Sequence, residues 1–303
     1  MEGVADWAMR DLLSDLGGID LCVTEFIRVT SNLHPFSVFH RFCPELKTNS
    51  KTKSGAPVMV QLLGGQPTAL ADNAARAAEL GAYGIDLNFG CPAKTVNRHD
   101  GGASLLKASD RIFNIVSEVR KTVPASIPVS AKIRLGFDDP KACIENSIAI
   151  DQAGASWLTV HCRTKTDGYR PPAYWNWIPK IKEKVQLPVI ANGEIWTPED
   201  FMRCQQITNA DAYMIGRGAI RNPFLFKKIK KQEAPKNKNT KQLVIPFYDA
   251  STSYLNEHFA VARTKGWLKQ LGVAAPEIKE IFDEIKILKK PNEFRSKLEY
   301  YFS

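Results

Sequence analysis

The chain has 303 residues, a length that fits one large α/β domain or a barrel with an appendage. Its hydrophobic content of 44% and charged content of 24% are ordinary for a globular protein and exclude a disordered chain. No run approaches 18 consecutive apolar residues, and no basic stretch followed by an apolar one opens the chain. The sequence therefore predicts a cytoplasmic protein without a membrane span or a signal peptide.

Seven short apolar runs rich in β-branched residues are predicted to be strands. They begin at Leu21, Pro57, Gly84, Pro128, Trp157, Pro188 and Ala212. Segments with helical periodicity lie between them, at residues 68–80, 108–122, 142–153, 178–185 and 198–207. Repeated strand and helix units require parallel strands that are buried on both faces. A doubly wound sheet normally carries a glycine fingerprint in its first turn, which is missing here, so the pattern favours a (β/α)₈ TIM barrel.

Seven strands are one fewer than a closed barrel needs. The opening segment MEGVADWAMRDLL is typical of a loop that runs into a helix. We therefore expect the first strand to lie upstream of Met1, whether the recorded start is late or the chain is truncated. A barrel without that strand would expose a seam of unpaired backbone groups.

The pattern changes near residue 230. A polar, Lys-rich stretch without periodicity predicts a linker over residues 231–242, which would separate a barrel domain (1–230) from a small all-helical domain (243–303). From Arg221 to Ser303 the chain has 17 Lys and Arg against 9 Asp and Glu, whereas the formal charge of the whole chain is +9. This asymmetry indicates a polyanionic partner for the C-terminal part, and a solvated basic surface is the competing interpretation.

Active sites of (β/α)₈ enzymes lie at the C-terminal ends of the strands, and polar residues are frequent there in this sequence. They are Gln61, Asn88, Cys91, Lys132, Arg134, His161, Arg163, Asn192, Glu194 and Arg217. The glycine-containing segments ANGE and IGRGA follow the last two strands, as a phosphate site would require, and Arg217 is available to pair with the phosphate.

Two of these side chains have competing interpretations. Lys132 lies inside an apolar strand, so its ammonium must meet an electron-rich group. That group is either the N1/C2 carbonyl edge of a flavin or a carboxylate in a structural ion pair, from Asp86 or Glu194. His161 is either a satisfied core histidine or a hydrogen-bond partner of a cofactor.

Six cysteines are scattered without the spacing of a zinc site or a disulfide framework, and we expect no metal. Cys91 differs from the others because it stands on a loop between Gly90 and Pro92, where a thiol is accessible. A thiol with an ordinary pKa of about 8.5 is protonated at neutral pH and can act as a general acid. Cys91 is therefore the candidate proton donor.

With these residues in place, the sequence resembles the bacterial tRNA-dihydrouridine synthase family over essentially its whole length. The matching segments are MEGVAD at Met1, TEFIRV at Thr24, VQLLGGQP at Val60, DLNFGCPAKTV at Asp86, GGASLL at Gly101, KIRLGF at Lys132, HCRT at His161, IANGEIW at Ile190 and MIGRGA at Met214. The resemblance implies FMN in the barrel mouth and NADPH as reductant, with NADH as the second option. It also implies reduction of a tRNA D-loop uridine to 5,6-dihydrouridine.

The resemblance further assigns roles to single residues. Cys91 would give a proton to C5 of a flipped-out uracil while a hydride passes from the flavin to C6. The implied FMN contacts are Met1, Glu2, Gly3, Gln61, Lys132, His161, Asn192, Gly193, Glu194, Gly216 and Arg217. Asn88 would hydrogen-bond the uracil, and Arg28 would contact the RNA near it.

The segment VARTKGWLKQL at Val261 resembles class C of the family, which is directed to uridine 16. Lys265 and Trp267 match RNA-binding positions of that class, although Trp267 also fits the core of a helix. Gly272 stands where the family tends to carry Arg.

Two other interpretations of the function remain open. The first is a flavin enzyme that acts on free pyrimidines, which would not need a basic helical appendage. The second is a catalytically impaired tRNA-binding protein, which follows if the truncation is real and whose mark would be salt-sensitive binding without flavin. If the protein binds RNA, we expect that RNA to be tRNA. We expect the protein itself to be a monomer.

Overall fold

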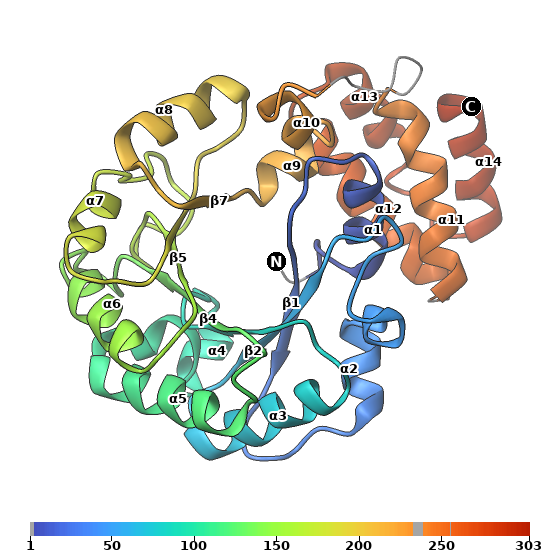
Figure 1. Cartoon of the computed structure of the whole chain (residues 1–303). Helices are drawn as coiled ribbons and strands as arrows, with labels where there is room; N and C mark the ends of the chain where they lie inside the picture. Colours follow the sequence, from blue (N-terminus) through green and yellow to red (C-terminus); the bar gives the residue numbers. More distant parts are fainter. Residues whose placement is uncertain (1–2, 233–238, 255) are drawn as a thin grey trace. The chain divides into compact units, whose positions relative to one another are not determined.

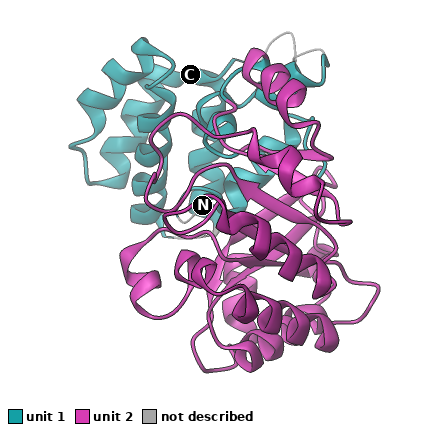
Figure 2. Cartoon of the chain, turned by 90° about the vertical axis from the view of Figure 1, so that its left-hand side faces the viewer, with its two compact units in different colours: residues 1–20, 196–198, 216–303 teal, residues 21–195, 199–215 magenta. Residues whose placement is uncertain are grey.

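A computed structural model describes residues 3–232, 239–254 and 256–303. The chain divides into two compact units, which Figure 2 shows in different colours. The sheet unit comprises residues 21–195 and 199–215, and the helical unit comprises residues 1–20, 196–198 and 216–303. Residues 233–238 of the predicted linker lie outside the described residues, and the domain boundaries expected at residues 230 and 243 remain a prediction.

The sheet unit is built on seven parallel strands that follow one another in chain order. They are β1 (Cys22–Arg28), β2 (Val58–Leu63), β3 (Ile85–Asn88), β4 (Val129–Arg134), β5 (Leu158–His161), β6 (Val189–Asn192) and β7 (Ala212–Met214). All seven predicted strands are confirmed. The sheet curls into a half-barrel (Figure 1), and within the described residues no pairing joins β7 to β1.

Helices α3, α5, α6, α7 and α8 lie outside the curved sheet (Figure 1) and confirm the five predicted helical segments. The helices of this part of the chain are α2 (Phe36–Phe42), η1 (Pro44–Thr48), α3 (Pro67–Glu79), α4 (Lys94–Arg98), η2 (Gly102–Lys107), α5 (Ser109–Thr122), α6 (Ala142–Gln152), α7 (Trp177–Lys182) and α8 (Pro198–Thr208). Helix α5 buries Ile112, Ile115, Val116 and Val119. This spacing places one apolar stripe against the sheet.

Strand β2 shows why the sheet forms the core of this unit. Every residue from Val58 to Leu63 is buried, because helices cover one face of the strand and the barrel interior takes the other. Burial of one large aliphatic side chain contributes about 1.5–3 kcal/mol, so a shift of this strand would be costly. Gln61 is the single polar side chain of β2, and it belongs to the site described below.

The helical unit has an apolar core of its own. Its helices are α1 (Trp7–Asp15), α9 (Arg217–Arg221), α10 (Leu225–Ile229), η3 (Lys241–Leu243), α11 (Val244–Tyr254), α12 (Glu257–Leu271), α13 (Pro276–Ile285) and α14 (Pro291–Phe302). Phe247, Trp267, Leu268 and Phe294 are buried in it. The predicted helical C-terminal region is confirmed. In the part of the chain that is described, no helix has the length and apolar character needed to cross a membrane.

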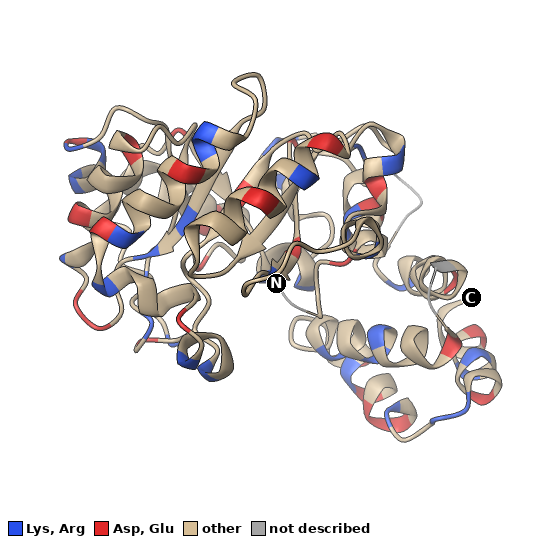
Figure 3. Ribbon diagram, turned by 90° about the horizontal axis from the view of Figure 1, so that it is seen from below, with Lys and Arg blue, Asp and Glu red and all other residues tan. Residues whose placement is uncertain are grey.

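Basic and acidic residues are interspersed over the helical unit (Figure 3). Lys286, Lys290 and Lys297 each pair with a carboxylate of this unit. Surface pairs of this kind contribute only about 0–1 kcal/mol. Lys269 and Lys279, in contrast, are exposed and have no ion pair among the described residues. Part of the basic charge of the C-terminal region is thus used internally, and part faces solvent.

Candidate active site

Polar side chains meet at the C-terminal ends of five neighbouring strands of the sheet unit. They are Gln61 on β2, Asn88 on β3, Lys132 on β4, His161 on β5 and Asn192 on β6. Asn88 is the register partner of Lys132, and His161 is that of Asn192. The structure therefore brings these five predicted site residues together at the edge of the sheet where barrel enzymes carry their active sites.

Lys132 provides the positive charge of this cluster. Its Nζ donates a hydrogen bond to Oδ1 of Asn192 at 3.0 Å. Burial, together with the neighbouring positive charge of Arg134, lowers the pKa of Lys132 to about 8. Within the described residues, neither Asp86 nor Glu194 lies within 4.0 Å of the ammonium, so the ion pair considered from the sequence is not formed. Two N–H bonds of Lys132 remain available to a ligand.

A chain of hydrogen bonds runs from the interior of the sheet to the loop that follows β3. Ser130 donates its hydroxyl to Oδ1 of Asp86 at 2.6 Å, and Gln61 donates Nε2 to Oδ2 of Asp86 at 2.7 Å. Asn88 donates Nδ2 to Oε1 of Gln61 at 2.9 Å, and the backbone N–H of Gly90 donates to Oδ1 of Asn88 at 3.0 Å. Each side-chain amide is thus held at both its nitrogen and its oxygen.

Asp86 is the buried carboxyl group of this chain of hydrogen bonds, with 1% of its surface exposed. Burial raises the pKa of the Asp86 carboxyl above its ordinary value, and the hydrogen bonds from Ser130 and Gln61 and the positive charge of Lys132 offset only part of this rise. A buried carboxylate is tolerated only when such donors and charges compensate for the lost hydration. The network therefore supplies part of the compensation that an ionised Asp86 needs.

Cys91 lies half-buried on the loop between β3 and α4. Its carbonyl accepts hydrogen bonds from Nδ2 of Asn97 at 2.9 Å and from the backbone N–H of Ala103 at 3.0 Å. Gly102 packs against this loop with a φ of +62°, and a Cβ there would lie 2.8 Å from the Cys91 carbonyl oxygen. Any side chain at position 102 would displace the loop that carries the thiol.

The buried guanidinium of Arg134 ties this loop to its neighbour. Its Nε donates to the carbonyl of Gly90 at 2.9 Å, and its Nη1 donates to the carbonyls of Thr164 and Gly168 at 2.9 and 2.8 Å. The side chain also lies over the ring of Tyr169, 5.2 Å from its centroid. Burial lowers the pKa of Arg134. The loops after β3 and β5 are therefore held by one side chain of β4.

His161, at the end of β5, is packed by the turn that follows β6. Gly193 has a φ of +120°, and a Cβ at this position would lie 3.0 Å from Cδ2 of His161. Arg163 places Nη1 3.4 Å from Nε2 of His161, and its Nη2 pairs with Oε1 of Glu194 at 2.5 Å. The carboxylate of Glu194 is thus engaged by a buried arginine that also lies beside the imidazole of His161.

The remaining predicted FMN contacts belong to the helical unit or lie outside the residues that the structure describes. Gly216 directly precedes α9, and the guanidinium of Arg217 lies over the ring of Trp196 at 5.1 Å. Gly3 also belongs to this unit, whereas Met1 and Glu2 lie outside the described residues. A phosphate site at Gly216 and Arg217 remains a prediction.

The predicted RNA contacts differ in exposure. Arg28 is exposed at the end of β1. The ammonium of Lys265, on α12, donates a hydrogen bond to the carbonyl of Leu288. Trp267 is 1% exposed, packs edge-on against Phe247 with ring centroids 4.7 Å apart, and donates Nε1 to a backbone carbonyl. The structure thus places Trp267 in the helix core, the alternative that the sequence left open, and an RNA contact there remains a prediction.

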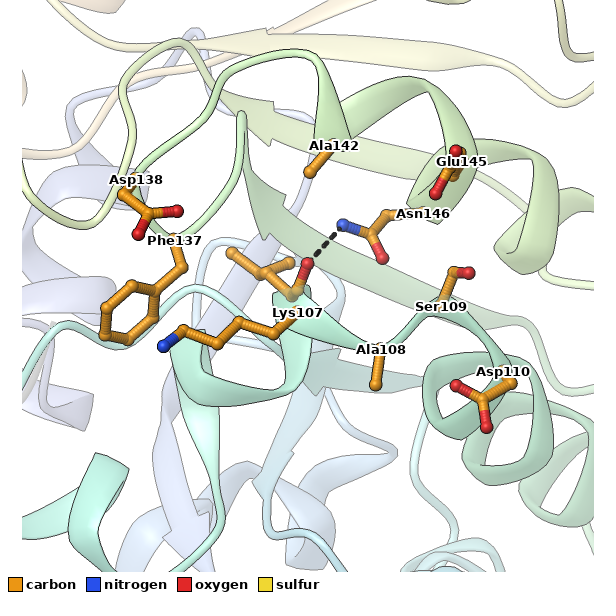
Figure 4. Close-up of a pocket in the computed structure, with 10 residues that line it drawn as sticks. Lys107, Ala108, Ser109, Asp110, Phe137, Asp138, Ala142, Glu145 and Asn146 are labelled. Atoms are coloured by element: carbon orange, nitrogen blue, oxygen red, sulfur yellow. Dashed lines mark hydrogen bonds between the residues drawn. The ribbon is translucent and has the colours of Figure 1, made fainter.

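A cavity of about 300 Å³ lies in the sheet unit. Figure 4 shows the side chains that line it. The loop after β4 and the first turns of α5 and α6 line it, and Asn146 donates Nδ2 to the carbonyl of Leu106 across one wall at 3.0 Å. None of the predicted site residues lines this cavity, so we assign it no part in the reaction.

The sequence pattern predicts Asp86 only as a partner for Lys132 and assigns no role to Ser130. The sequence nevertheless contains a signal for both. Side chains two residues apart on a strand point to the same face, and Asp86 precedes Asn88 by two residues as Ser130 precedes Lys132. A polar residue at such a position in a buried strand needs a partner on that face. The pattern therefore indicates a second polar layer beneath the strand ends.

Comparison with known proteins identifies the class of protein to which this fold and site belong. Residues 1–302 match the dihydrouridine synthase (Dus) family. The chain belongs to the dihydrouridine synthase family, and the resemblance found from its motifs is confirmed.

Three similar relatives share one name, tRNA-dihydrouridine(16) synthase. The chain is 48% identical to that of Shewanella oneidensis over 99% of this chain and 95% of the relative. It is 46% identical to that of Aquipseudomonas alcaligenes, with 94% and 93% covered, and 47% identical to that of Vibrio parahaemolyticus, with 96% and 91% covered. Among solved structures, a variant of NCR from Zymomonas mobilis matches with a TM-score of 0.53 at 15% identity. This match covers 78% of this chain and 83% of that one, and it bears on the fold alone.

Proposed function

We propose that the chain is a tRNA-dihydrouridine(16) synthase, which reduces uridine 16 in the D-loop of tRNA to 5,6-dihydrouridine. The observation that carries this proposal is the identity of 44–48% over 94–99% of the chain to relatives of that name. In this proposal the seven strands correspond to strands of a (β/α)₈ barrel, and the reaction takes place in the cytoplasm at its strand ends.

The residues at the strand ends fit FMN as the cofactor. A flavin has a pyrimidine edge of carbonyl and N–H groups that gains negative charge on reduction. The ammonium of Lys132 has two N–H bonds free for such an edge, and Gln61 keeps one N–H and one lone pair on its amide. We infer that Lys132, Gln61, His161 and Asn192 hold the ring. We infer that Glu194 positions one wall of this site through its pair with Arg163.

When bound, FMN supplies the hydride that C6 of the uracil accepts, after its own reduction by NADPH. Transfer of a hydride to C6 leaves negative charge at C5, which needs a proton to complete the reduction. We infer that Cys91 donates this proton, because a thiol is a suitable acid at neutral pH and the loop around it is fixed by Asn97 and Ala103. Asn88 would hold the uracil through its amide.

The tRNA would be held by basic residues outside the cluster. Arg28 is exposed at the end of β1, and the helical unit exposes further lysines such as Lys269 and Lys279. Neutralised phosphates release counterions, so binding through these residues depends steeply on salt. Lys265 is a further proposed RNA contact that favours uridine 16.

A purified protein tests the proposal directly. It should be yellow, its flavin absorbance should bleach on addition of NADPH, and the colour should return fastest with unmodified tRNA. Mapping of dihydrouridine in that tRNA should find it at position 16. Turnover of a free pyrimidine without RNA would instead support the related flavin enzymes. Salt-sensitive tRNA binding by a colourless protein would support a binding function without catalysis.

A further inference from the structure

The imidazole of His161 has one of its two ring nitrogens in contact with a buried arginine. Nη1 of Arg163 lies 3.4 Å from Nε2 of His161, with its N–H directed at that nitrogen. A Cβ at Gly193 would lie 3.0 Å from Cδ2 and 3.4 Å from Nε2 of the same ring. The edge of the ring that carries Cδ2 and Nε2 therefore faces Arg163 and Gly193, and Nδ1 lies on the opposite edge.

Arg163 is itself held on its other sides. The side chain is fully buried, its Nε donates to the carbonyl of Pro172 at 3.3 Å, and its Nη2 pairs with Oε1 of Glu194 at 2.5 Å. A guanidinium has five N–H donors and no acceptor, and it keeps its proton in proteins. Nε2 of His161 must therefore present a lone pair, because a proton on Nε2 would collide with the N–H of Arg163.

The charges around His161 act in the same direction as this contact. Among the described residues, the charged and titratable groups on the elements next to the imidazole are Arg163 and Tyr169 after β5, Lys132 and Arg134 on β4, and Glu194 after β6. The carboxylate of Glu194 is the one negative group of this set, and it is already paired with Arg163. An imidazolium would add a positive charge beside positive neighbours, so the neutral ring is favoured.

We propose that Arg163 is a positioning residue that holds His161 as a neutral imidazole with its proton on Nδ1. In this form any hydrogen bond of Nδ1 is one that it donates, so His161 acts as an uncharged donor. This inference rests on the proposed function, in which His161 helps to hold FMN, and deepens it. Histidine is the commonest general acid in enzymes. A neutral imidazole has no proton to give near neutral pH, so the proton transfer is left to Cys91.

Nuclear magnetic resonance of the wild type, labelled with ¹⁵N-histidine, tests the proposed form of the ring. Long-range ¹H–¹⁵N spectra show which ring nitrogen carries a proton, and the signals of His161 are those that disappear in His161→Gln. From about pH 6 to 8, with and without FMN, we expect Nε2 to have the chemical shift of an unprotonated nitrogen and Nδ1 that of a protonated one. An imidazolium or a proton on Nε2 at neutral pH would overturn the inference.

A double substitution tests whether Arg163 is the cause. Arg163→Met combined with Glu194→Gln removes both charges of the buried pair, which is tolerated better than the loss of one partner. His161 should then take up a proton as the pH falls through about 6.5. Glu194→Gln alone is the matched control, because it keeps Arg163 beside His161, and it should keep the wild-type spectrum. A folded double variant with the wild-type spectrum of His161 would show that Arg163 has no such role.

The consequence for the reaction is tested in Cys91→Ala with FMN bound. A histidine acid would make the residual dihydrouridine formed in a single turnover rise severalfold as the pH falls from about 7.5 to about 5.5. We expect no such rise. A rise that His161→Gln abolishes would make His161 a second acid and contradict the inference.

The wild type separates this inference from the proposed function. The spectrum of His161 is read without FMN as well as with it, and it does not depend on the folding of any variant in the buried pair. A wild type that binds no FMN refutes the proposed function, whereas a wild type that binds FMN and carries the His161 proton on Nε2 refutes only the role of Arg163.

Discussion

The polar network at the strand ends of the sheet unit and the core of the helical unit both contain buried side chains, yet they are held by different forces. At the strand ends, Asp86, Gln61 and Asn88 form a chain of hydrogen bonds with distances of 2.7 to 2.9 Å. In the helical unit, Trp267 and Phe247 pack edge-on with ring centroids 4.7 Å apart. The first arrangement fixes directions of donors and acceptors, and the second removes apolar area from water.

This difference separates residues that serve chemistry from residues that serve stability. A satisfied hydrogen bond adds only about 0.5–1.5 kcal/mol to folding, so a polar network is a weak source of stability for the space it occupies. Removal of a buried aromatic side chain costs about 3–5 kcal/mol. We therefore expect substitutions at the strand ends to change binding and reaction, and substitutions in the helical core to change the free energy of unfolding.

Cys91→Ala should give the largest functional effect at the strand ends. Loss of a general acid slows the reaction by about 10²–10⁴-fold, whereas the affinities for FMN and tRNA should persist. The measurement is dihydrouridine formed in a single turnover. Cys204→Ala, at a buried thiol of α8, is the control and should react like the wild type. Unimpaired reaction in Cys91→Ala would remove this residue from the mechanism.

Trp267→Ala should give the largest loss of stability in the helical unit. The indole is 1% exposed and donates Nε1 to the carbonyl of Ile220 at 3.0 Å, so its removal should cost about 3–5 kcal/mol. Urea unfolding measures this cost. Tyr300→Ala, at a side chain 77% exposed, should change the unfolding free energy by no more than about 0.5 kcal/mol. A stable Trp267→Ala protein with tenfold weaker tRNA binding would reverse the comparison and make Trp267 an RNA contact.

Lys132→Gln should weaken FMN binding about 10–100-fold, which corresponds to a lost hydrogen bond from a charged donor. The pKa of Lys132 is lowered to about 8, so its ammonium is charged below this pH and neutral above it. FMN affinity of the wild type should therefore fall as the pH rises through about 8, and the fall should disappear in Lys132→Gln. Fluorescence titrations between about pH 7 and 9.5 test both statements. An equal fall in both proteins would mean that another group titrates.

Arg28→Ala should give the smallest effect of the four, a loss of tRNA affinity of a few fold. One phosphate contact fewer should also reduce the slope of log affinity against log salt by about 1. Filter binding at several salt concentrations measures the slope, and Arg203→Ala, at an exposed arginine of α8 that pairs with Asp200, is the control. A larger loss of tRNA affinity in Arg203→Ala than in Arg28→Ala would indicate that the RNA binds a different face of the sheet unit.

The strands and the larger helices could be predicted because their signals are local. The run at Pro128 combines β-branched residues with a proline at its start, and α5 repeats its apolar residues with helical spacing. Helix α2 was missed because seven residues that begin after Pro35 are too short to show a period. The C-terminal helices were expected, but their periodicity did not say which face of α12 is buried, so the place of Trp267 stayed open.

The sequence predicted which polar residues lie at the strand ends. It predicted less well which side chains these residues contact. Lys132 and Asn88 were found because strand ends carry the chemistry of this fold. Which side chain Asp86 would meet depends on the register between strands, in which Gln61 is the direct partner of Asp86. Register is set by long-range packing and turn geometry, which a single sequence does not display. The pairing of Glu194 with Arg163 was hidden for the same reason.

The distribution of the cysteines has a practical consequence for chemical labelling. Five thiols are buried, and burial raises the pKa of Cys143 to about 12 and that of Cys204 to about 11, which suppresses their reactive thiolate forms. Among the described residues, Cys91 is the one cysteine that is not fully buried. A maleimide dye or crosslinker should therefore attach to the native protein at Cys91. Its attachment would report on any molecule that binds at the strand ends.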